Sequence, residues 1–217
     1  MPRTTRSPEE VKIIKDRILE TALKLLIEDG FMHFSMRRLA ARLRITAASI
    51  YNYFTNKDEL YLLIQTRGFE MLYDAIYEAS KKPASSEKKL ENIIRAYLKF
   101  GMDNPEYYEI MFSRNTPKYI DYQGTAIEPT AFYEKQTALM SADIAIGVIS
   151  DLFKNKKTIS GRMLRLRMLQ IWCTLNGTIN LFNSRVLQEV EDNTQTAIRF
   201  IAKDVMKRVK SELEGQP

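Results

Sequence analysis

Residues 31–60 read FMHFSMRRLAARLRITAASIYNYFTNKDEL, and this stretch decides the fold. It contains two short segments, 36–43 and 47–53, in which apolar residues recur with helical spacing. Ser35 and Thr46 precede these segments, and both residue types are typical helix N-caps. Two short helices separated by a tight turn form a helix-turn-helix, whose second helix enters the major groove of DNA. The stretch therefore predicts a DNA-binding element.

The apolar residues of this stretch are expected to hold the two helices against a preceding one. They are Leu39, Leu43, Ile45, Ile50 and Phe54. The exposed face of the second helix then carries Ala47, Ala48, Tyr51 and Asn52. The two alanines allow a close approach to base edges, and their methyl groups can contact thymine methyls. Tyr51, Tyr53 and Lys57 suit phosphate contacts, with core packing as the alternative for the two tyrosines.

The distribution of charge supports the same element. Residues 1–57 hold 11 Lys and Arg against 6 Asp and Glu, whereas the other 160 residues hold 22 against 21. No acid lies between Asp29 and Asp58, where four arginines and Lys57 lie. Such a field attracts a phosphate backbone, although a solvated basic face is the alternative interpretation. Arg3 and Arg6, before the first helix, are expected to reach a minor groove or phosphates.

The rest of the chain also has helical periodicity, and no segment alternates with the two-residue period of a strand. A capping box at Ser7 and Glu10 begins a first helix, which Gly30 is expected to end. Later helices are expected near residues 57–82, 87–103, 105–114, 130–155, 160–184 and 193–213, with the longest loop at 115–129. The expected fold is all-α: a three-helix DNA-binding head (1–56) and a ligand-binding and dimerisation domain (57–217), joined by the helix at about 57–82.

The sequence resembles the TetR family of repressors. The matching residues are Ser35, Arg37, Leu39-Ala40, Thr46, Ser49-Ile50-Tyr51, Tyr53-Phe54, Asn56-Lys57 and Leu60. They cover that family's DNA-binding region over about 50 residues. The resemblance implies that Arg37 reads a base, since arginine can bridge two guanine acceptors. It also implies backbone contacts by Ser35, Tyr51, Tyr53 and Lys57.

One position departs from the family pattern. The turn usually carries Gly where this chain has Arg44, so we expect a reshaped or mildly strained turn and a further phosphate contact. The complete set of expected DNA-contacting residues is Ser35, Arg37, Arg44, Thr46, Ala47, Ala48, Ser49, Tyr51, Asn52, Tyr53 and Lys57.

The larger body is rich in aromatic and methionine residues, which can line an adaptable apolar pocket. The segment 104–112 and the later Trp172, Asn176 and Gly177 resemble one C-terminal subclass of the family. That subclass has Trp, His and Gly at the later site, so Asn176 replaces an imidazole here. The expected effector pocket comprises Tyr97, Phe100, Tyr108, Met111, Phe112, Met140, Trp172 and Asn176. Ordinary core packing is the alternative for each of them.

The expected helices 160–184 and 193–213 carry apolar residues on more than one side. A helix at the outside of a monomer needs only one apolar face. The extra apolar surface predicts a homodimer through these two helices, and the resemblance implies a four-helix bundle. A two-fold dimer would present two reading heads to two half-sites.

Several classes of protein are disfavoured. The chain has one His and one Cys, His33 and Cys173, which cannot build a catalytic triad or a metal site, so neither an enzyme nor a cofactor is expected. A lone cysteine fits a reducing compartment. The N-terminus MPRTTRSPEE lacks the apolar core of a signal peptide, and no run of about 18 apolar residues is present. We therefore expect a cytoplasmic protein without a membrane partner.

Together these features predict a transcriptional repressor. It would bind a palindromic operator in double-stranded DNA as a homodimer and respond to a small apolar effector. Two alternatives remain open: an activator of the same fold, and a helical small-molecule-binding protein without DNA binding.

Overall fold

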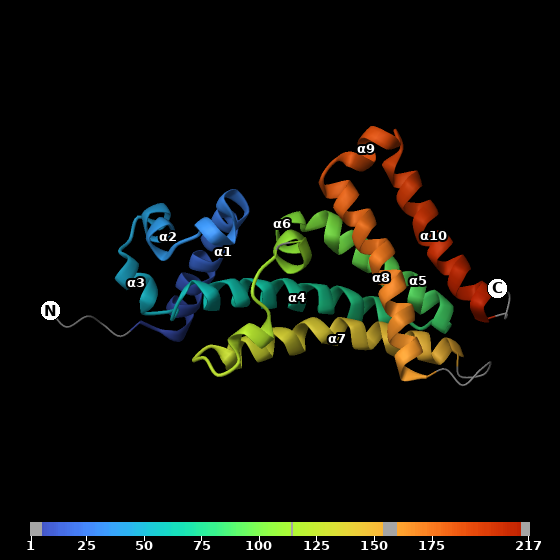
Figure 1. Ribbon diagram of the computed structural model, residues 1–217, viewed down its shortest axis with the longest axis horizontal. Helices are drawn as coiled ribbons and strands as arrows, with labels where there is room; N and C mark the ends of the chain where they lie inside the picture. Colours follow the sequence, from blue (N-terminus) through green and yellow to red (C-terminus); the bar gives the residue numbers. More distant parts are fainter. Residues whose placement is uncertain (1–5, 114, 154–159, 214–217) are drawn as a thin grey trace. The chain divides into compact units, whose positions relative to one another are not determined.

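The computed structural model describes residues 6–113, 115–153 and 160–213, and every regular element within these ranges is a helix (Figure 1). In chain order the elements are α1 (Pro8–His33), α2 (Met36–Leu43), α3 (Ala47–Tyr51), α4 (Lys57–Lys81), α5 (Ser86–Asp103), α6 (Pro105–Tyr108), the π-helix η1 (Glu109–Ser113), the 3-10 helix η2 (Tyr119–Tyr122), α7 (Glu128–Phe153), α8 (Gly161–Asn183), α9 (Val186–Val190) and α10 (Thr194–Leu213). The all-α prediction is confirmed. Arg3 lies outside the described residues.

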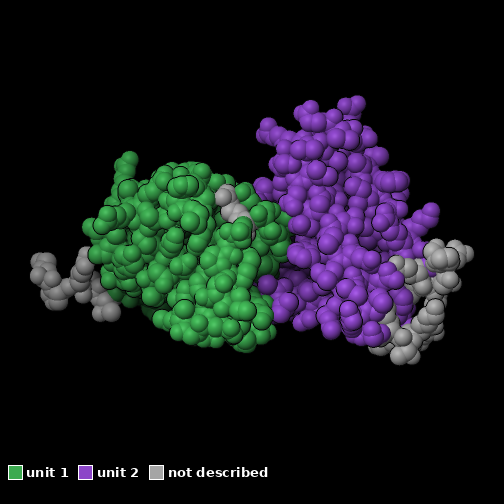
Figure 2. Space-filling model, viewed as in Figure 1, with its two compact units in different colours: residues 1–69, 106–136 green, residues 70–105, 137–217 purple. Residues whose placement is uncertain are grey.

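The chain divides into two compact units (Figure 2). The first comprises residues 1–69 and 106–136, and the second comprises residues 70–105 and 137–217. The first unit therefore contains the three-helix head together with the start of α4 and the segment 106–136. The division into compact units does not follow the order of the chain, because the first unit includes residues 106–136. The functional boundary expected after residue 56 therefore stays a prediction.

The first unit is built on a continuous apolar core beneath α1, α2 and α3. Ala22, Leu26, Leu39 and Ile50 have no exposed surface at all. Burying a leucine or isoleucine side chain stabilises a fold by about 1.5–3 kcal/mol, so this core fixes the position of the two short helices. The structure corrects one expected core residue: the side chain of Ile45 is 41% exposed.

The junction between α6 and η1 is fixed by two side chains of α4. The Tyr61 hydroxyl donates a hydrogen bond of 2.9 Å to the carbonyl oxygen of Ile110, and the Gln65 amide donates one of 3.1 Å to the same oxygen. The expected single helix at 105–114 is thus a short α-helix followed by a π-helical turn. The expected loop at 115–129 contains η2, and α9 was not expected.

The second unit contains α5, α8, α9 and α10. Ser85 caps α5 by accepting a hydrogen bond from the Lys88 amide, and Ser160 caps α8 by accepting one from the Met163 amide. The Asn183 side chain donates a 3.1 Å hydrogen bond to the carbonyl oxygen of Gly101, which ties the end of α8 to α5.

Among the described helices, only α7 is long and apolar enough to cross a membrane, judged by length and composition. It runs through both units, and 28% of its apolar stretch is buried. A single helix of this kind also occurs in proteins that never enter a membrane, so it does not by itself indicate one.

Candidate nucleic-acid interface

The helix-turn-helix is fixed by two N-caps. The Ser35 hydroxyl accepts a 3.3 Å hydrogen bond from the backbone amide of Arg38, and the Thr46 hydroxyl accepts one of 3.2 Å from the amide of Ser49. Each cap satisfies an amide that a helix start leaves without a partner. Thr46 and Ser49 also share a hydrogen bond of 2.9 Å between their hydroxyls. Three of the expected contact residues therefore also hold the two helix starts in place.

The turn between the helices places Arg44 in the left-handed region, with φ 57° and ψ 41°. Its amide donates a 3.1 Å hydrogen bond to the carbonyl oxygen of Ala41, and the next amide, of Ile45, bonds the carbonyl of Ala40 at 3.0 Å. This pattern ends a helix well, but it normally uses glycine, which has no side chain to clash. The arginine therefore strains the turn, and its own side chain is exposed.

Two of the four arginines in this region are neutralised by acids of α1. Arg38 lies 2.8 Å from the Asp29 carboxylate, and Arg42 lies 2.6 Å from that of Glu28. The hydrogen bond from Arg42 lowers the pKa of Glu28, so the carboxylate stays ionised. The basic field expected from the sequence is thus weaker than the count of arginines indicates. The acids were missed because they precede the acid-free stretch along the chain.

Arg37 and Arg44 differ from these two arginines. Both side chains are exposed, and neither makes an ion pair with any residue that the structure describes. Arg37 lies in the first turn of α2, and Arg44 is the residue directly after α2, in the turn that leads to α3. They are therefore the two arginines of the helix-turn-helix whose charge remains available to an anion.

The outer face of α3 is open to solvent. Ala48 and Asn52 are exposed, and the Tyr51 side chain is 53% exposed, so core packing does not account for it. Ala47 is partly buried against the core. The buried side of the same helix carries Ile50, so the exposed and apolar faces are separated as a groove-reading helix requires.

Two expected phosphate-contacting residues already have partners. Tyr53 packs partly on the core, and its hydroxyl accepts a hydrogen bond from Arg6. The Lys57 ammonium lies 4.6 Å from the centre of the Phe31 ring, in a cation–π contact. Neither contact was expected, because each joins side chains far apart in the sequence. Both also place a cation beside the helix-turn-helix.

The eight residues predicted to line an effector pocket are divided between the two units. Tyr108, Met111 and Phe112 belong to the first; Tyr97, Phe100, Met140, Trp172 and Asn176 belong to the second. In the second unit, the Trp172 indole donates a 2.7 Å hydrogen bond to the Tyr97 hydroxyl. Asn176 lies one turn further along α8 and is partly buried, whereas Met140 is 41% exposed.

Metal ligands do not cluster in the part of the chain that the structure describes. No three His, Cys, Asp or Glu side chains there converge on a position that could hold a metal ion.

Comparisons with known proteins agree with this geometry. Residues 18–70 match the sequence model of bacterial regulatory proteins of the tetR family. Residues 90–203 match that of the tetracyclin repressor-like C-terminal domain. The two matches together cover the helix-turn-helix and most of the larger body.

Individual relatives are distant. The nucleoid occlusion factor SlmA of Glaesserella parasuis is 26% identical over 104 residues, which are 48% of this chain and 51% of the relative. The transcriptional activator FasR of Mycolicibacterium smegmatis is 21% identical over 113 residues, 52% of this chain and 51% of the relative. The chain thus spans about half the length of these curated relatives.

A solved structure matches over nearly the whole chain. A bacterial regulatory protein of the tetR family from Rhodococcus RHA1 superimposes with a TM-score of 0.70, covering 90% of this chain and 96% of that one at 14% identity. This likeness shows a shared fold. With the two family matches and the capped helix-turn-helix, it leads to one conclusion: the chain belongs to the TetR family of helix-turn-helix transcriptional regulators.

Proposed function

We propose that this protein is a cytoplasmic, ligand-responsive transcriptional repressor that binds a palindromic operator as a homodimer. The observation that carries the proposal is the availability of two arginines, Arg37 at the start of α2 and Arg44 in the turn that leads to α3, whose outer face is exposed. The other two arginines, Arg38 and Arg42, form ion pairs with acids of α1. The helix-turn-helix therefore has cations that stabilise the fold and cations that are available to DNA. Neither a catalytic role nor a membrane partner is part of the proposal.

In this proposal α3 enters the major groove. Arg37 reads a base, while Ala47 and Ala48 let the helix backbone lie close to the base edges. The remaining contact residues bind phosphates and set the register of the helix. They are Ser35, Arg44, Thr46, Ser49, Tyr51, Asn52, Tyr53 and Lys57.

The proposed dimer uses α8 and α10. Exposed apolar side chains lie on both helices: Met163, Leu166 and Leu169 on α8 are 40–44% exposed, and Phe200 on α10 is 70% exposed. A groove of about 590 Å³ runs between these two helices. A second copy would remove this apolar surface from water and give the two reading heads a fixed separation.

The proposed effector is a small, largely apolar molecule with one or two polar groups. The contact between Trp172 and Tyr97 supports a site in the second unit, because both groups offer polar tips within an apolar surface. We also assign the body to the Trp-His-Gly subclass, with Asn176 in place of His. The effector must bind the DNA-free state more tightly in order to shift the equilibrium.

The experiment that tests the DNA-binding proposal is selection from a randomised duplex library, followed by salt titration of the selected site. We expect a palindrome and an affinity that falls steeply with salt. Lys57→Ala should reduce the salt slope by about one unit, which is the expected result for one lost phosphate contact. Absence of any salt-dependent binding would favour a small-molecule-binding protein without DNA binding.

Activation of transcription is the second candidate. It is favoured by one observation, since the relative FasR is a transcriptional activator. Transcription in vitro from a promoter that carries the selected palindrome separates the two functions. Repression should lower transcript levels as protein is added, and activation should raise them.

A further inference from the structure

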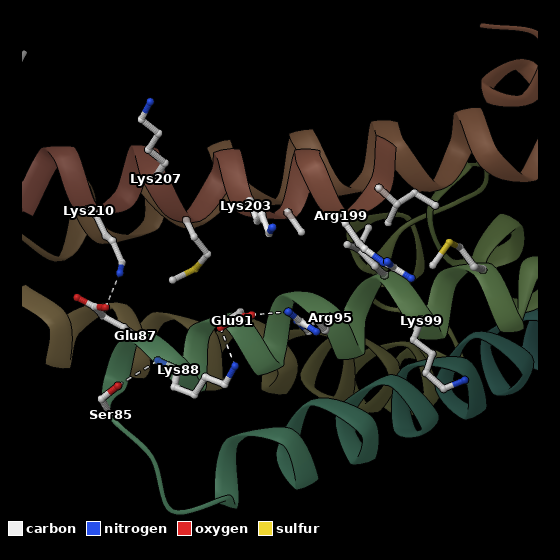
Figure 3. A pocket seen from close by; sticks show the side chains of 15 residues that line it. Ser85, Glu87, Lys88, Glu91, Arg95, Lys99, Arg199, Lys203, Lys207 and Lys210 are labelled. Atoms are coloured by element: carbon white, nitrogen blue, oxygen red, sulfur yellow. Dashed lines mark hydrogen bonds and ion pairs between the residues drawn. The ribbon is translucent and has the colours of Figure 1, made fainter. Parts of the chain in front are cut away.

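The groove between α5 and α10 has no part in the proposed function. Its volume is about 830 Å³, and it is lined by residues 85–102 and 198–210 of the second unit (Figure 3). Small-molecule sites occupy about 300–1,000 Å³, so the groove has room for such a ligand. None of the eight residues predicted for the effector pocket lines it.

The lining is strongly basic, with seven cations and two acids. Four of the cations are neutralised: Lys88 and Arg95 by Glu91 (2.9 and 2.6 Å), Lys210 by Glu87 (2.7 Å), and Lys99 by Asp103. The hydrogen bond from Lys88, with a second from Arg95, lowers the pKa of Glu91. The α5 side of the groove is therefore balanced in charge.

The other three cations lie on α10 at four-residue spacing: Arg199, Lys203 and Lys207. None of them pairs with an acid among the residues that the structure describes. Like charges one turn apart repel each other on a helix, so a bound anion would stabilise this arrangement. Figure 3 shows Arg199 extending from α10 toward α5, whereas Lys207 points away from α5. Arg199 and Lys203 are thus the two unneutralised lining cations that do not point away from α5.

Apolar side chains form the remainder of the lining. They are Leu98 and Met102 on α5 and Ile198, Ala202 and Met206 on α10. Leu98 and Ile198 are almost completely buried, at 3% and 6% exposure, and so form a fixed floor. The two methionines are flexible and can adapt to the shape of a ligand. The groove therefore offers an apolar floor beside one pair of free cations.

We propose that this groove binds an anionic amphiphile. Its apolar chain would pack on the floor between α5 and α10, and its single phosphate or carboxylate head would be held by Arg199 and Lys203. The planar guanidinium fork suits the oxygens of either head group. An acidic protein helix fits less well, because it would need free cations on both edges, and those of α5 already have partners. The site is separate from the predicted effector pocket and does not depend on DNA binding.

Methionine methyl NMR of the full chain tests this proposal. Dodecyl phosphate, kept below its micelle concentration, should shift the signals of Met102 and Met206 saturably. Dodecanol and inorganic phosphate, which each lack one half of the recognised chemistry, should bind much more weakly. Dodecanoate serves as a further probe, and its affinity relative to dodecyl phosphate assigns the preferred head group.

Three single variants localise the head group. Arg199→Gln and Lys203→Gln should each weaken dodecyl phosphate binding about fivefold, as expected for an exposed charge contact. Lys207→Gln is the matched control. It removes the same charge one turn further along α10, and the Lys207 side chain points out of the groove. All three residues are exposed, and circular dichroism checks that the helices are retained.

The proposal is overturned if Lys203→Gln binds dodecyl phosphate as tightly as Lys207→Gln, or if dodecanol binds equally well. Shifts confined to Met111 and Met140 would overturn it too, because those residues belong to the predicted effector pocket. Tighter binding of a synthetic acidic amphipathic peptide than of dodecyl phosphate would replace the amphiphile with a protein partner.

Discussion

The Nη2 atom of Arg38 lies 2.8 Å from Oδ1 of Asp29, so that a carboxylate of α1 neutralises a cation of α2. The other oxygen of Asp29 is buried and has no hydrogen-bond partner among the described residues. Removing Arg38 would leave a largely buried carboxylate without its countercharge, which destabilises a fold. Arg38 is thus committed to the fold, whereas its neighbour Arg37 is exposed and available.

The first prediction concerns Arg37. If Arg37 reads a base, Arg37→Ala should weaken operator binding by about 1–3 kcal/mol and relax the preference at one position of each half-site. Arg42→Ala is the matched control, because Arg42 is paired with Glu28 and should leave the sequence preference unchanged. Binding-site selection with both variants measures this. Identical preferences for wild type and Arg37→Ala would exclude the reading role.

The second prediction concerns the strained turn. A non-glycine residue in the left-handed region costs about 1–2 kcal/mol, and glycine loses about 0.5–1 kcal/mol more on folding. Arg44→Gly should therefore raise the free energy of unfolding by about 0.5–1 kcal/mol. It should also weaken DNA binding and lower the salt slope by about one unit, because a phosphate contact is lost.

Arg185 provides the control for this combination of higher stability and weaker DNA binding. It lies directly before α9, far from Arg44 in the sequence, and also has a positive φ, 64°. Arg185→Gly should stabilise the protein similarly without changing DNA affinity. Urea unfolding and DNA titration of both variants give the answer. Equal DNA affinity for Arg44→Gly and wild type would show that Arg44 does not touch DNA.

Much of the fold was predictable because its signals are local. Ser35 and Thr46 each cap a helix by bonding the backbone amide three residues later, so these helix starts are specified by a short local sequence. Helix α2 begins and ends where the sequence predicted. Ile45 was misplaced for an equally local reason. Ile45 lies in the turn between the two helices, where no helical spacing fixes which way a side chain faces, and it follows the left-handed Arg44. The π-helical turn at 109–113 depends on hydrogen bonds from Tyr61 and Gln65, which no spacing reveals.

The candidate site was predictable in composition but not in pairing. The sequence identified four arginines near the turn, yet only the packing of α1 on α2 shows that two of them are neutralised. Similarly, Trp172 and Tyr97 were both expected near a pocket, while their hydrogen bond joins residues 75 positions apart. Contacts of this kind arise from tertiary structure, which a single sequence does not encode locally.

The third prediction concerns assembly. Phe200→Glu and Leu166→Glu place a charge in the apolar surface of α10 and α8, and should convert the dimer to a monomer that retains its helicity. Because one head cannot bind two half-sites, operator affinity should fall sharply. Met32→Glu is the control, since Met32 is 81% exposed on α1, which belongs to the other unit. Sedimentation measures the result. A wild-type monomer at micromolar concentration would contradict the proposed dimer.

The fourth prediction concerns pH. Burial raises the pKa of Glu134 on α7 to about 7, and the nearby Lys118 only partly opposes this. The folded state therefore holds a proton that the unfolded state releases between about pH 4.5 and 7, so stability falls as pH rises through this window. Glu134→Gln should abolish this fall and stabilise the protein at pH 8 by at most about 3 kcal/mol.

Urea unfolding of wild type and variant at pH 5 and pH 8 checks the sign. Glu189→Gln, at an exposed position of α9, controls for the loss of a charge alone. An equal pH dependence for wild type and Glu134→Gln would show that another group is responsible.

The fifth prediction concerns the effector and begins with Asn176. This residue lies one turn from Trp172 on α8 and is partly buried, so its amide needs polar partners from protein, water or ligand. A panel of apolar compounds, each with one or two polar groups, should include members that release DNA from the wild-type protein. For those compounds, Asn176→Leu should alter the concentration needed for release while leaving DNA affinity nearly unchanged, because the substitution preserves size but removes the amide.

Tyr97→Phe is the companion variant: it removes the hydroxyl that accepts the Trp172 hydrogen bond and should change the same response. Arg165→Lys, at an exposed position of α8 that does not line the groove of the proposed dimer, should change nothing. If the response of Asn176→Leu equals that of wild type, Asn176 is structural and the effector binds elsewhere. If no compound releases DNA, the protein regulates transcription without an effector of this class.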